Sequence, residues 1–255
     1  WGSNKLGKDL GIFAGDAILS DMTLLGVGLG GSRSGGATTL GGIGSGYIYP
    51  AWKGQIAYTT PNMNGFQATI GITNPDQGQA NGTTTAANGG RNQDRFGIEG
   101  KASYSWTGDV AGKVWASFAT YDRTGSEGSD ADGVANTTYV QDDYTTTAYD
   151  IGASVTSGNL GLVAYYYKAD GAGLTTNLLG RSGAAIVGGA IKKREQDGGY
   201  LQATYVIPTG TKLGVAYGVS NLDEASGETG TTLLDKNERW TVGAYHPLTK
   251  HLNLV

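Results

Sequence analysis

The sequence predicts an all-β fold, a transmembrane antiparallel β-barrel, from three observations. Its segments alternate apolar and polar residues one by one, it is rich in glycine and poor in proline, and short turns alternate with long polar segments. An alternation with a period of two indicates strands whose two faces meet different surroundings. Tight turns at one end and long loops at the other are typical of barrels that span a lipid bilayer.

The composition excludes several classes of protein. Glycine accounts for 45 of the 255 residues, and each glycine in a helix weakens it by about 1 kcal/mol. No segment approaches the roughly 20 consecutive apolar residues of a membrane-spanning helix. The absence of cysteine excludes disulfides and thiol chemistry, and the net charge of −4 argues against a nucleic-acid partner.

Five short turns divide the chain, and each contains residues that favour tight turns. Proline fixes φ near its turn value, whereas glycine and asparagine tolerate a positive φ. The turns are expected at residues 61–65, 107–109, 156–159, 208–210 and 247–250. Long polar segments lie at about 9–44, 75–93, 124–146, 169–195 and 222–236. We expect about ten complete strands of roughly 8–12 residues, the length that crosses a bilayer at a tilt.

The alternation is clearest between Arg95 and Trp106. One face is apolar and the other charged or hydroxylic; the apolar face carries Phe96, Ile98, Gly100, Ala102, Tyr104 and Trp106. Segments 66–73, 201–207 and 212–220 alternate in the same way, whereas in 113–122 the large rings of Trp115 and Tyr121 share the polar face. Aromatic residues that should form belts at the membrane surface are Tyr58, Tyr104, Trp106, Tyr205 and Trp240.

One segment departs from the strand pattern. Residues 16–26 have helical spacing of Ile18, Met22 and Leu25 inside the longest polar segment. We expect a short helix in a loop that folds into the barrel and narrows it. Because an open sheet edge cannot lie in lipid, the strands imply a larger closed barrel. Trp1 is an unusual start and 251–255 reads as the beginning of a strand, so we expect one barrel domain over 1–255 that is truncated at both ends.

Several stretches resemble the general porins of Gram-negative bacteria, of the β-proteobacterial type. They are residues 7–13, 16–22, 56–66, 161–167 and 202–214. The resemblance implies a homotrimer of 16-stranded barrels in the bacterial outer membrane, in contact with its lipid and lipopolysaccharide. It also implies passive diffusion of small hydrophilic solutes and ions without a cofactor, and an inward-folded third loop, about 9–44, as the constriction. On that alignment the chain begins near the fifth strand and ends in the fifteenth.

The family resemblance carries over to single residues only in part. Asp21 matches the first acidic residue of the constriction loop, but Leu25 stands where well-known members have the second. Thr59 stands where many members have an arginine on the facing wall.

The alternation assigns a set of charged side chains to the pore constriction. Basic residues are expected on the inner wall opposite two acidic residues of the loop; the set is Asp16, Asp21, Lys53, Arg95, Lys101, Lys113, Lys212 and Arg239. Opposed charges would create a field that orients solutes and biases ion selectivity. Alternatively, the wall charges pair with one another, with Glu99 and Asp150 as inward acidic partners, and Asp16 is simply a helix N-cap.

Three other functions compete with a general channel. A substrate-specific porin, for sugars for example, would place aromatic rings such as Trp115 and Tyr165 along the lumen. A soluble all-β binding or adhesin module would bury the apolar faces. An enzyme would need a nucleophile beside a base, but His246 and His251 lie on the short-turn side. No catalytic, cofactor or metal site is therefore predicted.

Two polar clusters outside the strands receive simpler interpretations. Residues 130–133, Asp-Ala-Asp-Gly, resemble the start of a calcium-binding loop but lack its remaining ligands. Residues 192–194, Lys-Lys-Arg, are expected to be a solvated basic cluster in a loop.

Overall fold

Almost every strand of the chain joins one antiparallel sheet in the computed structural model, which describes residues 1–25, 41–43, 52–74, 91–92, 95–129, 135–172, 183–229 and 235–255. The sheet contains β1 (Ser3–Leu10), β2 (Trp52–Thr59), β3 (Phe66–Thr73), β4 (Arg91–Asn92), β5 (Gly97–Trp106), β6 (Val110–Ser129), β7 (Ala135–Ser157), β8 (Leu160–Asp170), β11 (Glu195–Val206), β12 (Lys212–Leu222), β13 (Lys236–Thr249) and β14 (Leu252–Leu254). Its order is β1-β2-β3-β5-β6-β7-β8-β11-β12-β13-β14, with β4 beside β6. A separate hairpin pairs β9 (Ala184–Val187) with β10 (Ala190–Lys193). The predicted antiparallel all-β fold is confirmed.

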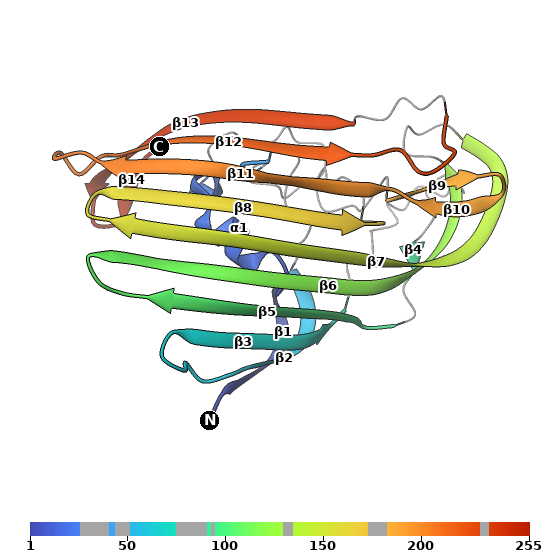
Figure 1. Ribbon diagram of the computed structural model, residues 1–255, viewed down its shortest axis with the longest axis horizontal. Helices are drawn as coiled ribbons and strands as arrows, with labels where there is room; N and C mark the ends of the chain where they lie inside the picture. The colour runs from blue at the N-terminus through green and yellow to red at the C-terminus, as the bar shows by residue number, and fades with distance from the viewer. Residues whose placement is uncertain are drawn as a thin grey trace.

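The short connections lie together at one end of the sheet and the long ones at the other (Figure 1). Four of the five tight turns fall where the sequence predicts them, whereas the turn expected at 247–250 lies at 250–251 because β13 continues to Thr249. Those four contain a residue with positive φ, such as Asn64 at 53° between β2 and β3 or Gly158 at 55° between β7 and β8. Glycine and asparagine tolerate this conformation better than other residues.

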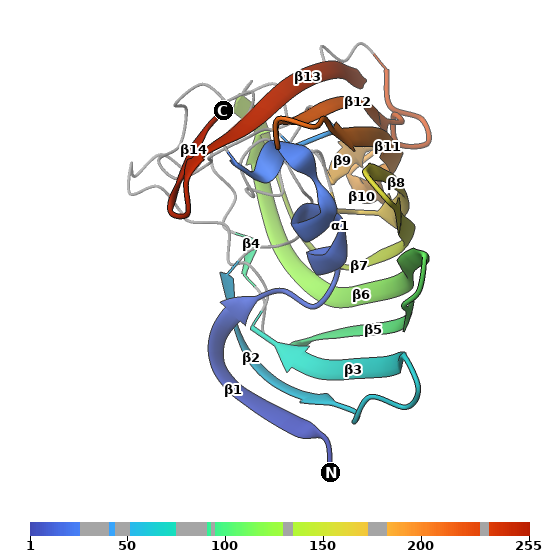
Figure 2. The same ribbon diagram turned by 90° about the vertical axis from the view of Figure 1, so that its left-hand side faces the viewer.

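The sheet curves into a trough (Figure 2), and the side chains on its two faces differ in chemistry. The convex face exposes large apolar side chains, among them Val242 at 80%, Leu201 at 64% and Ile151 at 60%. The concave face carries buried polar residues such as Gln202 and Thr146. This arrangement contradicts a soluble sandwich, which would bury its apolar faces in a dry core.

Two strands extend far beyond their predicted ends. Residues 124–146 were expected to form a polar loop, but β6 and β7 continue as a paired ribbon through Thr124 opposite Asp143 to Ser129 opposite Ala135. That prediction was wrong. Both sides of a ribbon beyond the bilayer can face water, so its residues need not alternate between apolar and polar.

Cross-strand pairs of glycine and an aromatic residue recur within the sheet. Gly100 pairs with Phe118 and Gly112 with Trp106 on the convex side, whereas Gly152 pairs with Trp115 on the concave side. In each pair the ring lies over the glycine, where an added Cβ would collide with it. Part of the high glycine content is therefore required by the large rings of neighbouring strands.

The predicted helical segment is a short helix, α1 (Gly15–Ser20), followed by a 3₁₀ turn, η1 (Met22–Leu25). Asp21 separates them with an extended backbone, and Ala14 rather than Asp16 is the N-cap of α1. Figure 2 shows α1 on the concave side of the sheet, as expected for an inward-folded loop. Within the described parts of the chain, no helix is long and apolar enough to cross a membrane.

Candidate pore constriction

The chain that leads from β1 into α1 is held by the inner wall through Glu99. This side chain is fully buried on β5, and its Oε2 accepts the backbone N–H groups of Ile12 at 2.7 Å and Phe13 at 3.0 Å. Its Oε1 forms an ion pair with the buried ammonium of Lys53 on β2. The hydroxyl of Ser117 on β6 accepts the next N–H, from Ala14. The wall thus supplies acceptors for the backbone N–H groups of the segment that leads into the helix.

The far end of the helical segment is held by strands on the opposite side of the trough. Tyr200 donates its hydroxyl to the Ala17 carbonyl at 2.6 Å. Gln202 accepts the N–H of Met22 at 2.7 Å and donates to the Ser20 carbonyl at 3.1 Å. The loop is therefore fastened at both ends of α1.

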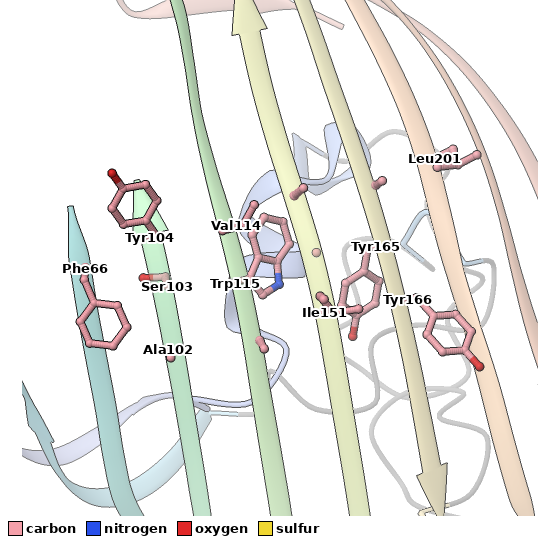
Figure 3. A pocket seen from close by; sticks show the side chains of 14 residues that line it. Phe66, Ala102, Ser103, Tyr104, Val114, Trp115, Ile151, Tyr165, Tyr166 and Leu201 are labelled. Carbon is pink, nitrogen blue, oxygen red and sulfur yellow. The ribbon is translucent and has the colours of Figure 1, made fainter. Parts of the chain in front are cut away.

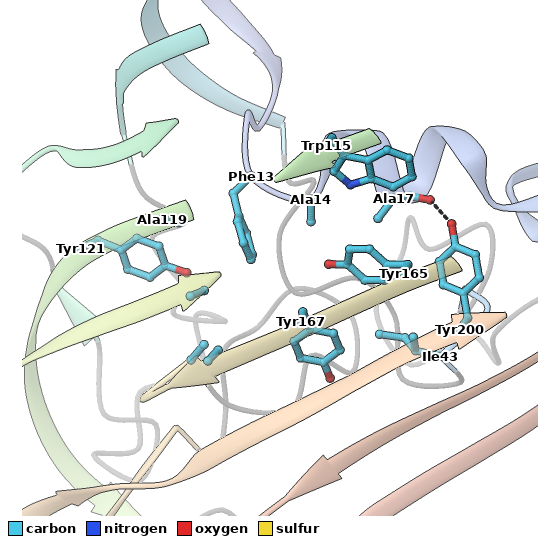
Figure 4. Close-up of a cluster of buried hydrophobic side chains, with 13 residues drawn as sticks. Phe13, Ala14, Ala17, Ile43, Trp115, Ala119, Tyr121, Tyr165, Tyr167 and Tyr200 are labelled. Atoms are coloured by element: carbon cyan, nitrogen blue, oxygen red, sulfur yellow. Dashed lines mark hydrogen bonds between the residues drawn. The ribbon is translucent and has the colours of Figure 1, made fainter. Parts of the chain in front are cut away.

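An aromatic cluster fills the space between α1 and the wall (Figure 4). Phe13, Ala14 and Ala17 pack on a group of rings from β6, β8 and β11, namely Trp115, Tyr121, Tyr165, Tyr167 and Tyr200. The centroids of Tyr165 and Tyr200 lie 5.6 Å apart. Trp115 and Tyr165 face inward, as the alternation predicted, but the loop covers them. They are not available for stacking against a sugar.

Asp16 lies between two lysines of the inner wall. One carboxylate oxygen accepts Lys101 of β5 at 2.8 Å, and the other forms an ion pair with Lys113 of β6. Burial alone would raise the pKa of Asp16, but the two ammonium groups outweigh burial and hold the pKa below its usual range. The loop acid and two of the predicted basic residues therefore meet directly.

We expect the contact of Asp16 with the wall to survive mild acid. The pKa of Asp16 is lower in the folded protein than in the unfolded chain, where it is about 3.9. The ion pairs therefore stabilise the fold fully at pH values above about 3.9. This stabilisation is lost only as the pH falls below that value. Single-channel current noise should therefore stay constant from neutral pH down to about pH 4. Asp16→Asn should raise the noise even at neutral pH, because neither lysine retains its carboxylate partner.

Asp9→Asn is the matched control for Asp16→Asn. Asp9 pairs with Lys5 on β1 and does not contact the helix through any described ion pair. This variant should change ion selectivity without adding noise. Equal noise in both variants would contradict the role of Asp16 in fixing the loop.

Asp21 joins two described parts of the loop. Its carboxylate accepts the N–H of Thr23 at 2.7 Å and the N–H of Gly42 at 2.6 Å, and its side chain is buried. Burial raises the pKa of Asp21 despite these hydrogen bonds and the nearby charge of Arg239. Arg239 on β13 itself donates to the Gly41 carbonyl at 3.3 Å. The Asp21 carboxylate thus points into the loop.

The remaining predicted basic residues have different environments. Lys53 is neutralised by Glu99. Lys212 lies with its ammonium 4.8 Å from the centroid of the Tyr245 ring, whose hydroxyl donates to the Met22 carbonyl. Arg95 precedes β5, has a side chain 68% exposed, and pairs with Asp122 at 3.1 Å. Its predicted place within the strand was wrong, because β5 begins at Gly97; no described contact joins Arg95 to the loop.

A cavity of about 330 Å³ lies between the loop and the wall of β1, β2, β3, β5 and β6. Its charged lining residues are Lys5, Asp9, Lys101 and Lys113, and uncharged polar side chains such as Thr59 and Gln67 complete it. The open space thus lies on one side of the loop, opposite the aromatic cluster. In the parts of the chain that the structure describes, no three His, Asp or Glu side chains gather as a metal site, and residues 130–133 lie outside those parts.

A family model described as Gram-negative porin matches residues 1–255. The chain belongs to the Gram-negative porin family. Porins of this family lie in the outer membrane, which agrees with the apolar convex face. No protein with a curated description matches the sequence.

The fold of this porin is similar to the crystal structure of the outer membrane channel DcaP of Acinetobacter baumannii. The TM-score is 0.67 at 15% sequence identity, over 98% of this chain and 62% of the DcaP chain. At this identity the likeness shows the fold alone. The chain spans less than two thirds of the length of DcaP.

The wall residues that fasten the porin loop were largely missed by sequence reasoning. Glu99 was assigned to the inward face by alternation, but nothing in its surroundings indicated that it would accept two loop amides. Tyr200, Gln202 and Tyr245 also lie on inward faces. An inward position therefore identifies residues that could hold the loop. Which loop group each one bonds to depends on the path of the loop.

Proposed function

We propose that this porin is a passive diffusion channel for small hydrophilic solutes and ions across the outer membrane. The observation that carries the proposal is the charged cavity between a fastened inner loop and the wall of a sheet whose outer side is apolar. Water and polar solutes can occupy such a space, whereas the convex face suits lipid. The proposal includes a single barrel domain over 1–255, part of a closed 16-stranded barrel that assembles as a homotrimer.

The constriction is proposed to consist of the loop from about residue 9 to 44 and the wall lysines that face it. The cavity and its border carry three lysines, Lys5, Lys101 and Lys113, against two aspartates, Asp9 and Asp16. The excess of positive charge should favour anions weakly. Lys53, Asp21, Arg239 and Lys212 would act mainly by holding the loop and by their longer-range charge.

Planar-bilayer recording of the protein tests this proposal. Conductance should appear in stepwise increments, in groups of three for a trimer, and the reversal potential in a salt gradient should indicate a preference for anions. Lys101→Gln with Lys113→Gln should lower the anion-to-cation permeability ratio by roughly two- to fivefold, because the local potential loses both positive charges.

Arg95→Gln is the matched control, because Arg95 is exposed and outside the cavity lining. It should leave the permeability ratio unchanged. Absence of any conductance would refute the channel. If the protein conducts but the anion-to-cation permeability ratio does not change when both lysines are replaced, the selective constriction lies elsewhere.

A further inference from the structure

The cavity between the loop and the wall has one apolar side. Gly15 and Leu19 line it from α1, one helical turn apart and therefore on one face of the helix. Leu10 at the end of β1 lies beside them, because its Cδ2 is 3.8 Å from the position that a Cβ on Gly15 would take. Leu19 is 65% exposed. These three residues form an apolar strip from which a solute with an apolar body can displace water. This strip faces inward, unlike the apolar residues of the convex face that Figure 3 shows.

The wall side of the same cavity carries an excess of positive charge. Lys101 and Lys113 share a single carboxylate, that of Asp16, so two ammonium groups face one acid. Each ammonium group has three N–H donors and uses one of them on Asp16. The two lysine side chains are 26% and 32% exposed. An anion that enters the cavity can therefore accept hydrogen bonds from either ammonium group.

Hydroxyl groups extend this donor surface across the neighbouring strands. Thr69 on β3 is directly opposite Lys101 in the register of β3 and β5, so the two side chains lie on the same face. The Thr69 hydroxyl is 2.9 Å from that of Thr59 on β2, and one of them donates to the other. The pair therefore keeps one O–H that can donate to a solute. A carboxylate, with two acceptor oxygens, can be held by Lys101 and by this pair together.

The size and the lining of the cavity select among anions. Its volume is about 330 Å³, and a cavity of about 150 Å³ accommodates benzene, so one aromatic ring with a carboxylate fits. A halide ion would leave the apolar strip in contact with water. A second carboxylate on the solute would have to lie on that strip or beside Asp9. An uncharged solute would gain nothing from the excess of positive charge.

We propose that this cavity is a binding subsite for small monocarboxylates with a compact apolar body, such as benzoate. The carboxylate lies against Lys101, Lys113 and the Thr69 hydroxyl, and the ring lies on the apolar strip. The inference rests on the proposed channel, because it places the subsite in the path of the permeating solute. It goes beyond a general preference for anions by naming the part of the solute that the loop itself contacts.

Binding and conductance are measured separately to test the subsite. Saturation-transfer NMR with sodium benzoate on the detergent-solubilised protein detects binding without transport, and benzoate added to a planar bilayer detects block of the ion current. We expect half-saturation in the millimolar range for a ligand of this size. Acetate lacks the ring and benzamide lacks the charge, so each should bind at least about fivefold more weakly than benzoate.

Leu19→Gln removes apolar surface from the strip at nearly constant side-chain size. It should weaken benzoate binding by about threefold to tenfold and leave acetate binding unchanged. Thr69→Val keeps the side-chain shape without the hydroxyl and should weaken the binding of both carboxylates by about threefold. Leu248→Gln is the matched control, the same exchange at a leucine of β13 that is 54% exposed and does not line the cavity. It should bind benzoate like the parent.

Three results would overturn the subsite: equal benzoate binding by the parent and Leu19→Gln, equal binding of acetate and benzoate, or benzamide bound as tightly as benzoate. Partition of benzoate into detergent is common to all variants and cancels in the comparison. A protein that conducts without binding benzoate refutes the subsite and leaves the channel in place. A protein that binds benzoate as expected without conducting refutes the channel and supports the binding cavity.

Discussion

Replacing Glu99 with glutamine is expected to loosen the inner loop and to destabilise the folded protein by roughly 3–5 kcal/mol, because the buried ammonium of Lys53 loses its counter-charge. A glutamine can present only one acceptor. If its oxygen faces the amides of Ile12 and Phe13, its NH₂ group faces the Lys53 ammonium. Single-channel recordings should show larger, fluctuating conductance, and the urea midpoint of unfolding should fall.

The double variant Lys53→Met, Glu99→Gln distinguishes the loss of the counter-charge of Lys53 from the loss of an acceptor for the loop amides. Without the ammonium, the glutamine oxygen can face the loop amides and its NH₂ group meets no like charge. We expect most of the lost stability and the quiet conductance to return, with a coupling between the two sites that a double-mutant cycle measures. A Glu99→Gln variant that unfolds and conducts like the parent would refute the anchoring role of Glu99.

Arg194→Met is expected to cause a loss of stability of similar size, again roughly 3–5 kcal/mol. Arg194 has no exposed surface and donates its Nε to Glu228 at 2.9 Å, with a second contact through its terminal nitrogen. Glu228 also accepts the N–H of Ala225 and thereby orders residues 225–228 between β12 and β13. Loss of the guanidinium would leave a buried carboxylate. Limited proteolysis should then cleave this connection faster.

Lys193→Met provides the comparison for Arg194→Met at the adjacent position. Lys193 pairs with Asp170, and both side chains are 35% exposed, so the change should cost only about 0–1 kcal/mol. If both variants lose the same stability, the buried pair has no special role. Residues 192–194 were expected to be a solvated basic cluster in a loop, which was wrong: Lys192 and Lys193 end β10, and Arg194 is buried.

Alternation predicted the strands and their faces well because it is a local property of the chain. It placed the rings of Trp115 and Tyr121 on the polar side of their strand, where both are buried in the structure. A period of two determines the face of each residue as soon as one neighbour is assigned. Tight turns were also predictable, since residues such as Asn64 and Gly158 meet a local backbone requirement.

Contacts between distant segments could not be read from such local patterns. Glu99 reaches amides 86 and 87 residues away in the sequence, and Arg194 pairs with a partner 34 residues away. The ribbon formed by β6 and β7 escaped prediction for another reason: its residues do not alternate regularly between apolar and polar. The alternation predicted a set of charged residues for the constriction, but only the path of the loop decides that Lys101 and Lys113 contact Asp16 while Arg95 pairs with Asp122.

The cavity lies on one side of the loop only, and this divides the wall into two parts with different tolerance to change. Substitutions beneath the helix, at Tyr200 for example, disturb the support that holds the loop. Gln67 and Thr69 line the cavity and bond to Thr60 and Thr59 rather than to the loop, so substitutions there leave the support of the loop in place. We therefore expect substitutions at the cavity-lining residues of β1 to β3 to change permeability, while the strands beneath the helix keep the loop in place.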